Sequence, residues 1–425
     1  MKNLSIVMCL VVWAASLWGC TESYVEPLPP RGQLYYPIGM EVHPNGQFLY
    51  VVNTNFDLRY RGNLGGTVSV VDTETGEILS GGTPFVPSYG GHLRLNEDAT
   101  KAFVTSRFNN EVTVLTVAAQ GQALYCEVEG EAVADSRPCQ VTRLPDVRGG
   151  NRLAIDPFGL AVTRAIRTIG GEEQVFDLVH VSHLRGEQVS TMSFPEGEIP
   201  GASLQSAALV SGGNQVVSRP GTQDLYVAGR SDNVVAAYRP YINENGQVEA
   251  IVRREVIELA RREDRVDARG IGFDETGEWL YVATRRPNAL HVIGMEAGAN
   301  RTPRVVRSIP LEQNPSELVV HEGADGVRRI YIPSYRHGLI QVVDAEQEAV
   351  VDVIEVGRNP YHMVVDSPVH CRVPGERCQA YVSLFDVRAE EDRRCQEGDE
   401  SCGRIAVLDL DPASETFHTV IDWIY

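Results

Sequence analysis

The chain lacks the sequence signatures of common enzyme classes and of nucleic-acid-binding proteins. It has no Gly-x-Ser-x-Gly turn for a hydrolase nucleophile, no His-Glu-x-x-His zinc pair and no glycine-rich phosphate loop. Only 38 of its 425 residues are Lys or Arg, against 57 Asp or Glu, which gives a net charge of −19. This balance argues against binding to a phosphate backbone, which needs a basic surface, so no nucleic acid is expected as a partner.

The first twenty residues have the pattern of a bacterial export signal. Lys2 supplies a positive charge, and residues 4–16 are apolar apart from two serines. This run is too short to span a bilayer as a stable helix. It ends at Leu17-Trp18-Gly19-Cys20, which resembles the lipobox of bacterial lipoproteins.

The lipobox resemblance implies cleavage before Cys20, acylation of its thiol and anchoring by several acyl chains. Thr21 follows Cys20, where Asp would resemble an inner-membrane retention signal. By analogy with Gram-negative lipoproteins, the protein is expected in the cell envelope, at the outer membrane, facing either the periplasm or the cell surface. The alternative is an ordinary signal peptide that happens to contain a cysteine.

The remaining cysteines are typical of an exported protein. Once Cys9 leaves with the signal and Cys20 is acylated, six remain: Cys126, Cys139, Cys371, Cys378, Cys395 and Cys402. An even number in an oxidising compartment predicts disulfides, although six cysteines allow fifteen connectivities. We expect pairing within 126–139, 371–378 and 395–402, because each pair brackets a polar, turn-rich loop. The alternative is zinc binding, but the six-residue spacing within the last two pairs is poor for a zinc site.

A strand–turn–strand unit recurs seven times along the chain. Segment 37–53 reads as a short strand, a Pro44-Asn45-Gly46 turn and a second strand. Further copies begin near residues 92, 157, 215, 270, 315 and 360. Near-continuous apolar runs are typical of strands buried on both faces, and radially stacked sheets bury a ring-shaped core. We therefore predict an all-β fold: a seven-bladed β-propeller with four-stranded antiparallel blades.

The second strands carry a family resemblance. Tyr50-Val51-Val52-Asn53 and Tyr281-Val282-Ala283-Thr284 resemble the Tyr-Val-Thr-Asn repeat of the YVTN (YncE-like) β-propellers, and the resemblance covers nearly all of residues 34–425. The domain prediction is a signal peptide over 1–19, a proline-rich tether over 20–33 and the propeller over 34–425. The family includes surface-layer proteins, periplasmic binders and relatives of lactonases and quinoprotein subunits, so the resemblance implies the fold more than the function.

Aligning the repeats predicts a set of residues around the propeller axis. The aligned position is occupied by Gly39, His92, Gly159, Gln215, Gly270, Glu317 and His362. Because His and Glu are common metal ligands, we hypothesise a small polar or metal-binding site at the channel mouth. The alternative is that these side chains simply contact channel water. No other cofactor is expected.

Cationic and aromatic residues follow the second strands, on the face where the first strands begin. They are Arg107, His183, Arg230, Arg285, Arg286, Tyr335, Arg336, His337 and Phe385, and Arg269 just precedes a first strand. Because Arg guanidinium groups suit carboxylates and phosphates, we hypothesise that this face binds an anionic ligand or an acidic stretch of an envelope protein. The alternative is a rim of arginines paired with nearby Asp and Glu. Both residue sets are expected on one face, as parts of one site.

These patterns favour a non-enzymatic binding or scaffold lipoprotein of the cell envelope, because variable loops make one propeller face a docking surface. Two other classes stay open. One is an enzyme with an axial His/Glu site, either a periplasmic lactonase-like hydrolase or a dehydrogenase-associated subunit. The other is a purely structural envelope component.

Overall fold

The structure is a computed structural model that describes residues 27–128, 131–133, 153–195, 203–260, 265–296, 301–366, 368–373, 375–387 and 402–425. The predicted signal peptide, Cys20, Cys139 and Cys395 lie outside these residues. Within the described ranges, no helix combines the length and apolar character needed to cross a bilayer.

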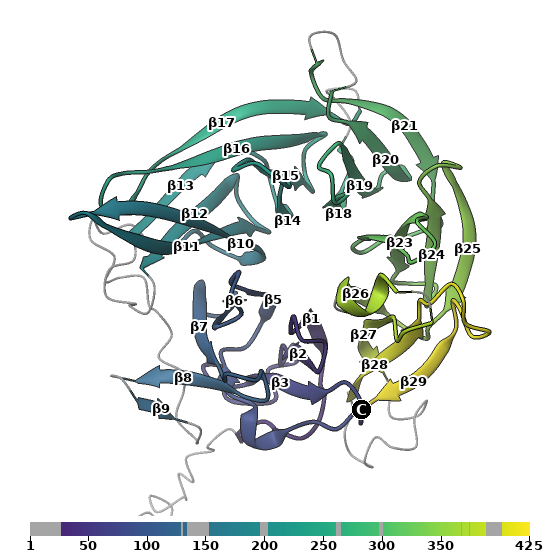
Figure 1. Ribbon diagram of the computed structural model, residues 1–425, viewed down its shortest axis with the longest axis horizontal. Coiled ribbons are helices and arrows are strands. Elements are labelled where there is room, and N and C mark those ends of the chain that lie inside the picture. Colours follow the sequence, from purple (N-terminus) through teal and green to yellow (C-terminus); the bar gives the residue numbers. More distant parts are fainter. Residues whose placement is uncertain are drawn as a thin grey trace, which may run out of the picture.

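Seven antiparallel sheets surround one axis in chain order, with the first strand of each sheet innermost (Figure 1). The prediction of an all-β, seven-bladed propeller is confirmed, with one difference: the second blade has five strands. The strands are β1 (Pro37–Val42), β2 (Phe48–Asn53), β3 (Gly66–Asp72) and β4 (Phe85–Val86) in blade 1; β5 (Gly90–Leu95), β6 (Lys101–Ser106), β7 (Glu111–Val117), β8 (Leu124–Val128) and β9 (Glu131–Val133) in blade 2; β10 (Pro157–Ile169), β11 (Glu172–His183), β12 (Gln188–Pro195) and β13 (Ser203–Ala208) in blade 3; β14 (Gly213–Ser218), β15 (Leu225–Gly229), β16 (Val234–Ile242) and β17 (Val248–Glu258) in blade 4; β18 (Ala268–Phe273), β19 (Trp279–Arg285), β20 (Asn288–Gly294) and β21 (Arg304–Pro310) in blade 5; β22 (Val319–Glu322), β23 (Arg328–Ser334), β24 (Leu339–Asp344) and β25 (Ala349–Glu355) in blade 6; and β26 (Pro360–Val365), β27 (Gln379–Val387), β28 (Cys402–Asp409) and β29 (Val420–Ile424) in blade 7. Two short helical turns are η1 (Ser80–Gly82) and α2 (Pro368–Cys371).

Aromatic residues of six second strands pack their blades onto the neighbouring ones. Each of these residues is at most 2% exposed: Tyr50, Phe103, Tyr226, Tyr281, Tyr331 and Tyr381. Tyr50 shares a cluster with Leu93 of blade 2, and Tyr281 shares one with Leu318 before β22. The repeated aromatic position therefore builds the core between neighbouring sheets, where apolar burial is the main source of stability.

The ring closes by packing between blades 1 and 7, because every sheet consists of consecutive strands. Leu34, Met40 and Tyr381 belong to one buried cluster at this junction. The backbone N–H of Gly403 donates to the carbonyl of Leu34 at 3.0 Å. The last residues of the expected tether also lie on blade 1, where Arg31 donates to the carbonyl of Thr83 at 2.7 Å.

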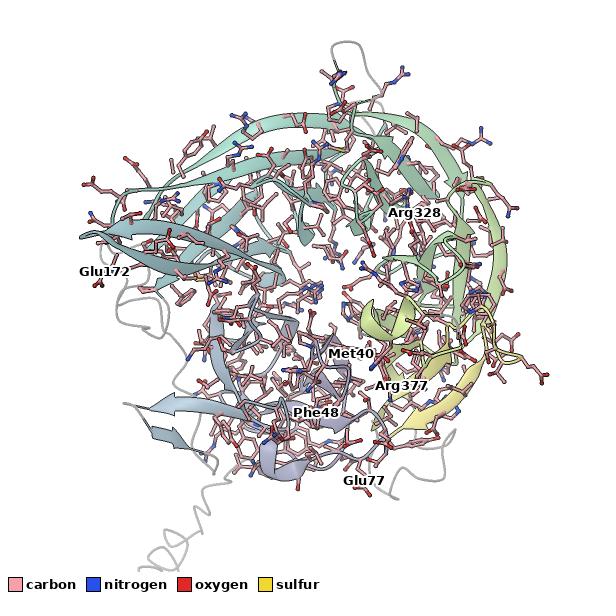
Figure 2. All side chains as sticks on the ribbon, in the orientation of Figure 1. Met40, Phe48, Glu77, Glu172, Arg328 and Arg377 are labelled. Carbon is pink, nitrogen blue, oxygen red and sulfur yellow. A yellow bond between two sulfur atoms is a disulfide. The ribbon has the colours of Figure 1, made fainter. Side chains whose placement is uncertain are left out.

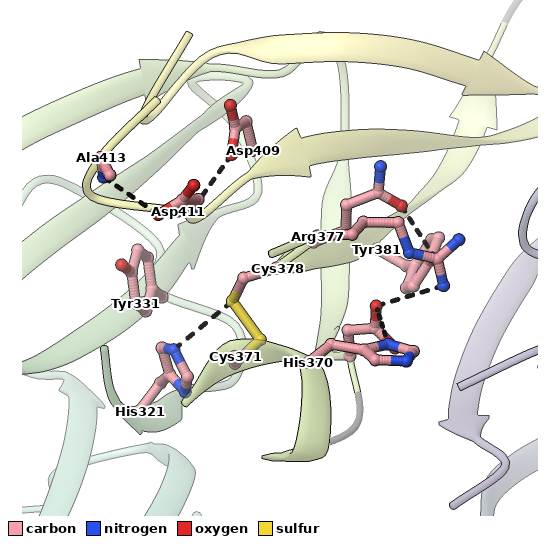
Figure 3. The surroundings of a disulfide bond; sticks show 12 residues. His321, Tyr331, His370, Cys371, Arg377, Cys378, Tyr381, Asp409, Asp411 and Ala413 are labelled. Atoms are coloured by element: carbon pink, nitrogen blue, oxygen red, sulfur yellow. Dashed lines mark hydrogen bonds and ion pairs between the residues drawn. A yellow bond between two sulfur atoms is a disulfide. The ribbon is translucent and has the colours of Figure 1, made fainter. Parts of the chain in front are cut away.

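A disulfide joins Cys371 to Cys378 (Figure 3). It ties α2 to the segment that leads into β27, and both cysteines are buried. His321 Nε2 lies 3.9 Å from Cys378 Sγ, and this trio is the metal-compatible cluster of His, Cys, Asp and Glu found among the described residues. Its two sulfurs are bonded to each other, so they offer no thiolate to a metal.

The other predicted disulfides fall partly outside the described residues. Cys126 is disulfide-bonded. Its expected partner Cys139, like Cys395 of the third pair, lies outside the described ranges.

Candidate functional site

Six inner strands share an irregularity that turns one residue toward the axis. The pairing register shifts within the first four residues of β1, β5, β10, β14, β18 and β26. Such a bulge inserts an extra residue and re-aims a side chain. The third residue of each of these strands is the aligned position identified from the repeats. Met40, next to it in blade 1, lies beside the central opening (Figure 2).

The polar members of the aligned set meet at a single buried carboxyl group, which we call the axial cluster. Glu317 Oε1 lies 2.9 Å from His92 Nε2. Its Oε2 accepts a hydrogen bond from Gln215 Nε2 at 2.9 Å and lies 3.3 Å from His362 Nε2. All four residues are at most 6% exposed. Residues from four different blades thus form one network.

Backbone groups fix the orientation of two members of the axial cluster. The N–H of Met40 donates to His362 Nδ1 at 3.2 Å, so the proton of the neutral ring is on Nε2, where it faces Glu317. The N–H of Ile271 donates to Gln215 Oε1 at 3.0 Å, which directs the amide NH₂ toward Glu317. The cluster is therefore built to present N–H donors to a carboxyl group.

Glycines at the aligned positions of blades 1, 3 and 5 give this network its space. A Cβ atom added at Gly270 would lie 2.7 Å from the carbonyl carbon of Glu317, and one at Gly159 would lie 2.7 Å from Gln215 Cα. One at Gly39 would lie 2.9 Å from His92 Cα. Each glycine therefore lets the polar residue of the next blade approach closely.

Burial shifts the protonation equilibria of the axial cluster. Desolvation raises the pKa of Glu317 to about 7, an effect that His362 and Arg94 oppose. Desolvation also lowers the pKa of His362 to about 3 and that of His92 well below its usual value. Near neutral pH both imidazoles are therefore neutral, and Glu317 is the group that gains or loses a proton.

The donors of the axial cluster do not fit a resident metal ion. His362 Nδ1 already accepts a backbone hydrogen bond, and its Nε2 carries a proton. The oxygens of Glu317 are occupied by His92, His362 and Gln215. In the parts of the chain that the structure describes, these residues do not form a group whose ligand atoms lie within 4.8 Å of one another. Among the described residues, the axial cluster therefore presents no ready set of metal ligands.

The axial cluster borders a large cavity of about 670 Å³, the axial cavity. His92, Gln215 and His362 line it together with residues at the ends of the inner strands, such as Val42 and Val365. Arg94 and Glu41 form an ion pair on its wall, with 2.9 Å between Nη1 and Oε2. Because this cavity extends away from the strand starts, the axial residues and the loops after the second strands do not line one cavity, contrary to the expectation from sequence.

A second cavity of about 220 Å³, the mouth cavity, lies at the starts of the inner strands. Arg107, Arg230, Arg269 and Arg285 line one part of it. Six aromatic residues form much of the remaining wall: Phe56, Tyr89, Phe158, Tyr335, Tyr361 and Phe385. The rings contact one another edge to face: Phe56 and Phe385 have centroids 5.3 Å apart, at an interplanar angle of 77°.

A third cavity of about 500 Å³, the arginine groove, adjoins the mouth cavity and shares Arg107, Leu184, Arg230 and Arg269 with it. Six arginines line the groove against two aspartates: Arg107, Arg185, Arg230, Arg265, Arg269 and Arg286 against Asp156 and Asp267. Counted over the residues that the structure describes, the groove lining has an excess of four positive charges, although the whole chain has a net charge of −19.

The two aspartates are shared between several arginines. Asp156 lies 2.7 Å from Arg107 Nε and 3.2 Å from Arg185 Nε. Asp267 Oδ1 lies 2.8 Å from Arg269 Nε and 3.7 Å from Arg230 Nε. Burial, together with the neighbouring positive charge of Arg269, lowers the pKa of Arg230. The same two causes lower the pKa of Arg285 to about 10. Several arginines therefore form ion pairs with aspartates, as the alternative of a charge-paired rim expected. The arginines nevertheless outnumber the two aspartates.

Some polar atoms on the wall of the mouth cavity have no hydrogen-bond partner. Within the described residues they include Thr54 Oγ1 and Asn214 Oδ1. An unsatisfied buried polar atom costs about 1–3 kcal/mol, so a ligand or water that pairs with these atoms stabilises the site.

Two other residues predicted from sequence lie apart from the mouth cavity and the arginine groove. Arg336 is exposed and lines neither the mouth cavity nor the arginine groove. His183 is buried, with Nδ1 3.0 Å from the carbonyl oxygen of Ile155 and Nε2 2.9 Å from Ser190 Oγ. Phe158 and Tyr361 were not singled out from sequence. Both directly precede an aligned axial residue, so the repeat alignment contained the signal that locates them.

Comparisons with known proteins agree with the fold. No protein-family model and no curated protein sequence matches the chain. Similar solved structures include the periplasmic gluconolactonase PpgL of Pseudomonas aeruginosa, with 17% identity over 76% of this chain and 86% of that one, at a TM-score of 0.52. A putative 6-phosphogluconolactonase of Bacteroides uniformis has 16% identity over 78% of this chain and 87% of that one, at a TM-score of 0.52.

A third similar structure is the dihydro-heme d1 dehydrogenase NirN in complex with DHE. It has 15% identity over 96% of this chain and 72% of that one, at a TM-score of 0.51. At such identities the similarities show a shared propeller fold, which is known to host unrelated functions.

Proposed function

We propose that this protein binds a small anionic ligand at the mouth cavity. The observation that carries the proposal is the excess of arginine over aspartate around a cavity whose other wall is aromatic. Burying like charges together is unfavourable unless a counter-charge is supplied. Arg guanidinium groups suit this task, because their planar donor pattern matches carboxylate and phosphate oxygens.

Titration calorimetry of the full chain in detergent, at low ionic strength, tests this proposal. The probes are benzoate, adipate and inorganic phosphate. We expect saturable binding of at least one of them, weakened about tenfold or more by Arg230→Gln, because a charge-assisted hydrogen bond is worth about 1.5–3 kcal/mol. Added salt should also weaken binding.

Arg239→Gln is the matched control for this experiment. Arg239 has a 30% exposed side chain and an aspartate partner, Asp224, as Arg230 has 29% exposure and Asp267. Arg239 lies in β16, outside both cavities. Equal effects of the two substitutions, or no saturable binding of any probe, would contradict the proposal.

We also propose that the propeller is a lipid-anchored YVTN-type protein of the cell envelope, at the outer membrane. Support comes from the lipobox-like Leu17-Trp18-Gly19-Cys20 and from the repeated Tyr-Val strands. Several acyl chains on Cys20 would give stable anchoring. Cys20→Ser should therefore move the protein from the membrane fraction to the soluble fraction of the cells. Unchanged membrane association of this variant would contradict the lipid anchor.

A second candidate function, lactone hydrolysis, is favoured by the pairing of His92 with Glu317 at the axial cavity. A carboxylate that orients an imidazole is the base arrangement of many hydrolases. A water in the cavity would add to the lactone carbonyl while His92 takes its proton. The ring C–O bond would then break as His92 returns the proton to the leaving oxygen, which yields a hydroxy acid. The lactonase folds among the similar structures support this candidate.

Acid release from glucono-δ-lactone, followed in a pH-stat between pH 6 and 8, tests the second candidate. The hydrolase interpretation predicts a rate above the spontaneous one that His92→Gln lowers at least about a hundredfold, the range for loss of a general base. His337→Ala, an exposed histidine outside the axial cavity, is the control. A rate equal to the spontaneous one would eliminate this candidate and leave the mouth cavity proposal standing.

A further inference from the structure

The mouth cavity and the arginine groove form one continuous site with two chemically different parts. The mouth cavity combines six aromatic side chains with four arginines, whereas charged side chains predominate along the groove. Arg107, Arg230 and Arg269 lie where the two cavities meet. A ligand that fills both cavities therefore has an apolar portion, and its charge begins at these shared arginines.

The size and walls of the mouth cavity suit a single planar ring. An apolar cavity of about 150 Å³ holds one benzene molecule, so about 220 Å³ accommodates one substituted ring. Tyr361 lies near Phe158 and Phe385, with ring centroids 6.4 and 6.3 Å away. Aromatic rings favour such offset or edge-to-face neighbours at 4.5–7 Å. A planar ring inserted here would extend an existing aromatic cluster.

The cavity has a floor, which limits how far a ligand enters. Phe158 and Tyr361 line the mouth cavity, and the next residues along β10 and β26 are the aligned axial residues Gly159 and His362. His92 also contacts Phe158, with ring centroids 5.1 Å apart. The axial cavity shares no lining residue with the mouth cavity. A ring therefore enters end-on and stops above the axial cluster, whereas a threaded polymer would find no through-passage.

The charge of the groove calls for more than one anionic group. Among the described lining residues, six arginines face two aspartates, an excess of four positive charges. A single carboxylate at Arg230 and Arg269 leaves the excess around Arg185, Arg265 and Arg286 unmatched, and all three of these arginines are exposed to solvent and able to meet a second group. Thr54 Oγ1 and Asn214 Oδ1 remain to hydrogen-bond with a polar substituent of the ring.

We infer that the ligand is a planar ring carrying two anionic groups, with the ring in the mouth cavity, one anion at Arg230 and Arg269 and the other in the arginine groove. This inference rests on the proposed anion-binding function and narrows its ligand class. In this arrangement the aromatic wall of the mouth cavity selects a ring. The exposed arginines of the groove, Arg185, Arg265 and Arg286, select the second anionic group.

Calorimetric titration of the full chain with terephthalate, benzoate and adipate tests the inference. Terephthalate has a ring and two carboxylates, benzoate lacks the second carboxylate, and adipate lacks the ring. We expect terephthalate to bind at least about tenfold more tightly than either of the other two. If none of the three binds but inorganic phosphate does, anion binding stands and the inference is overturned. If phosphate does not bind either, the proposed function itself fails. If all three bind with similar affinity, anion binding stands and the inference is overturned.

Two variants separate the contributions of the ring and of the second charge. Phe385→Leu should reduce the preference for terephthalate over adipate, with Tyr241→Leu, an exposed tyrosine of β16, as its control. Replacing Arg265 and Arg286 together by Gln should remove the preference over benzoate while benzoate binding persists. Tighter binding of linear polyphosphate than of terephthalate, unaffected by Phe385→Leu, would also overturn the inference, because it would indicate a groove for a linear polyanion.

Discussion

At the scale of single residues, the buried carboxyl of Glu317 is the most informative feature. A carboxylate taken out of water needs hydrogen-bond donors or a counter-charge, and Glu317 has three N–H-bearing side chains around it. Even so, burial raises its pKa to about 7. The residue is therefore held near the midpoint of its titration at neutral pH, a state that an ordinary surface glutamate does not reach.

Titration of Glu317 makes the free energy of unfolding depend on pH. Because its pKa rises from 4.5 to about 7 on folding, the folded protein binds more protons than the unfolded chain between these values. The contribution of Glu317 is thus fully present below pH 4.5 and is lost as the pH rises to 7, by about 3 kcal/mol. His92 and His362 act in the opposite sense, since their lowered pKa values cost stability only below pH 6.5.

Glu317→Gln should remove this pH dependence. We predict that the free energy of unfolding of the wild type, relative to the variant, falls by up to about 3 kcal/mol between pH 5 and pH 8. Urea denaturation at several pH values measures it, with Glu249→Gln, an exposed glutamate of β17, as the control. If the wild-type and Glu317→Gln curves run parallel across this range, Glu317 does not titrate as described.

The residue types at the axis were predictable from sequence, but their contacts were not. The repeat alignment identified His92, Gln215, Glu317 and His362 as one set, and the structure brings these four residues together. The alignment gave no reason to expect His92 to reach Glu317, four blades along the chain. That contact depends on how narrow the channel is, which the size of neighbouring residues decides.

At the scale of elements, the bulged inner strands position the axial cavity and the mouth cavity. In a regular strand, consecutive residues face opposite sides of the sheet. The register shift in six inner strands breaks this rule. As a result, Phe158 lines the mouth cavity while its neighbour Gly159 packs against the axial residue Gln215. The number of blades could be predicted from the repeated strand pattern. The bulge could not, because the amino-acid composition of these strands does not indicate it.

The glycines of the inner strands are predicted to be intolerant of even one added carbon. Gly270→Ala would place Cβ 2.7 Å from backbone atoms of Glu317 and Leu318, which only a shift of the neighbouring blade can relieve. We expect a loss of about 1–3 kcal/mol in the free energy of unfolding, as for other overpacked cores. Gly81→Ala is the control, because its added Cβ would have no neighbour within 4 Å. Equal stability of both variants would show that the axial packing is loose.

At the scale of the whole molecule, ring closure and charge distribution are the two notable features. Blades 1 and 7 meet without a shared strand, so the closure depends on side-chain packing and on contacts from the segment before β1. The charge distribution is uneven, since an acidic chain collects arginines at one mouth. The sequence predicted the collection of arginines, but the cavity that they line depends on loops from several blades.

Leu34 should be important for closure although it lies outside every strand. It is fully buried at the junction of blades 1 and 7. Leu34→Ala should lower the free energy of unfolding by about 2–5 kcal/mol, the usual cost of a buried leucine-to-alanine cavity. Leu28→Ala, with 45% exposure, is the control and should change it little. Urea denaturation of both variants decides between a packed closure and a loose one.

We propose above all that the arginine–aromatic mouth is a ligand site. A crystal structure of the protein soaked with terephthalate tests it most directly. We expect electron density for the ring among Phe56, Tyr361 and Phe385, with one carboxylate within hydrogen-bond distance of Arg230 or Arg269. Clear density for terephthalate elsewhere on the protein, with the mouth cavity filled by water alone, would contradict it.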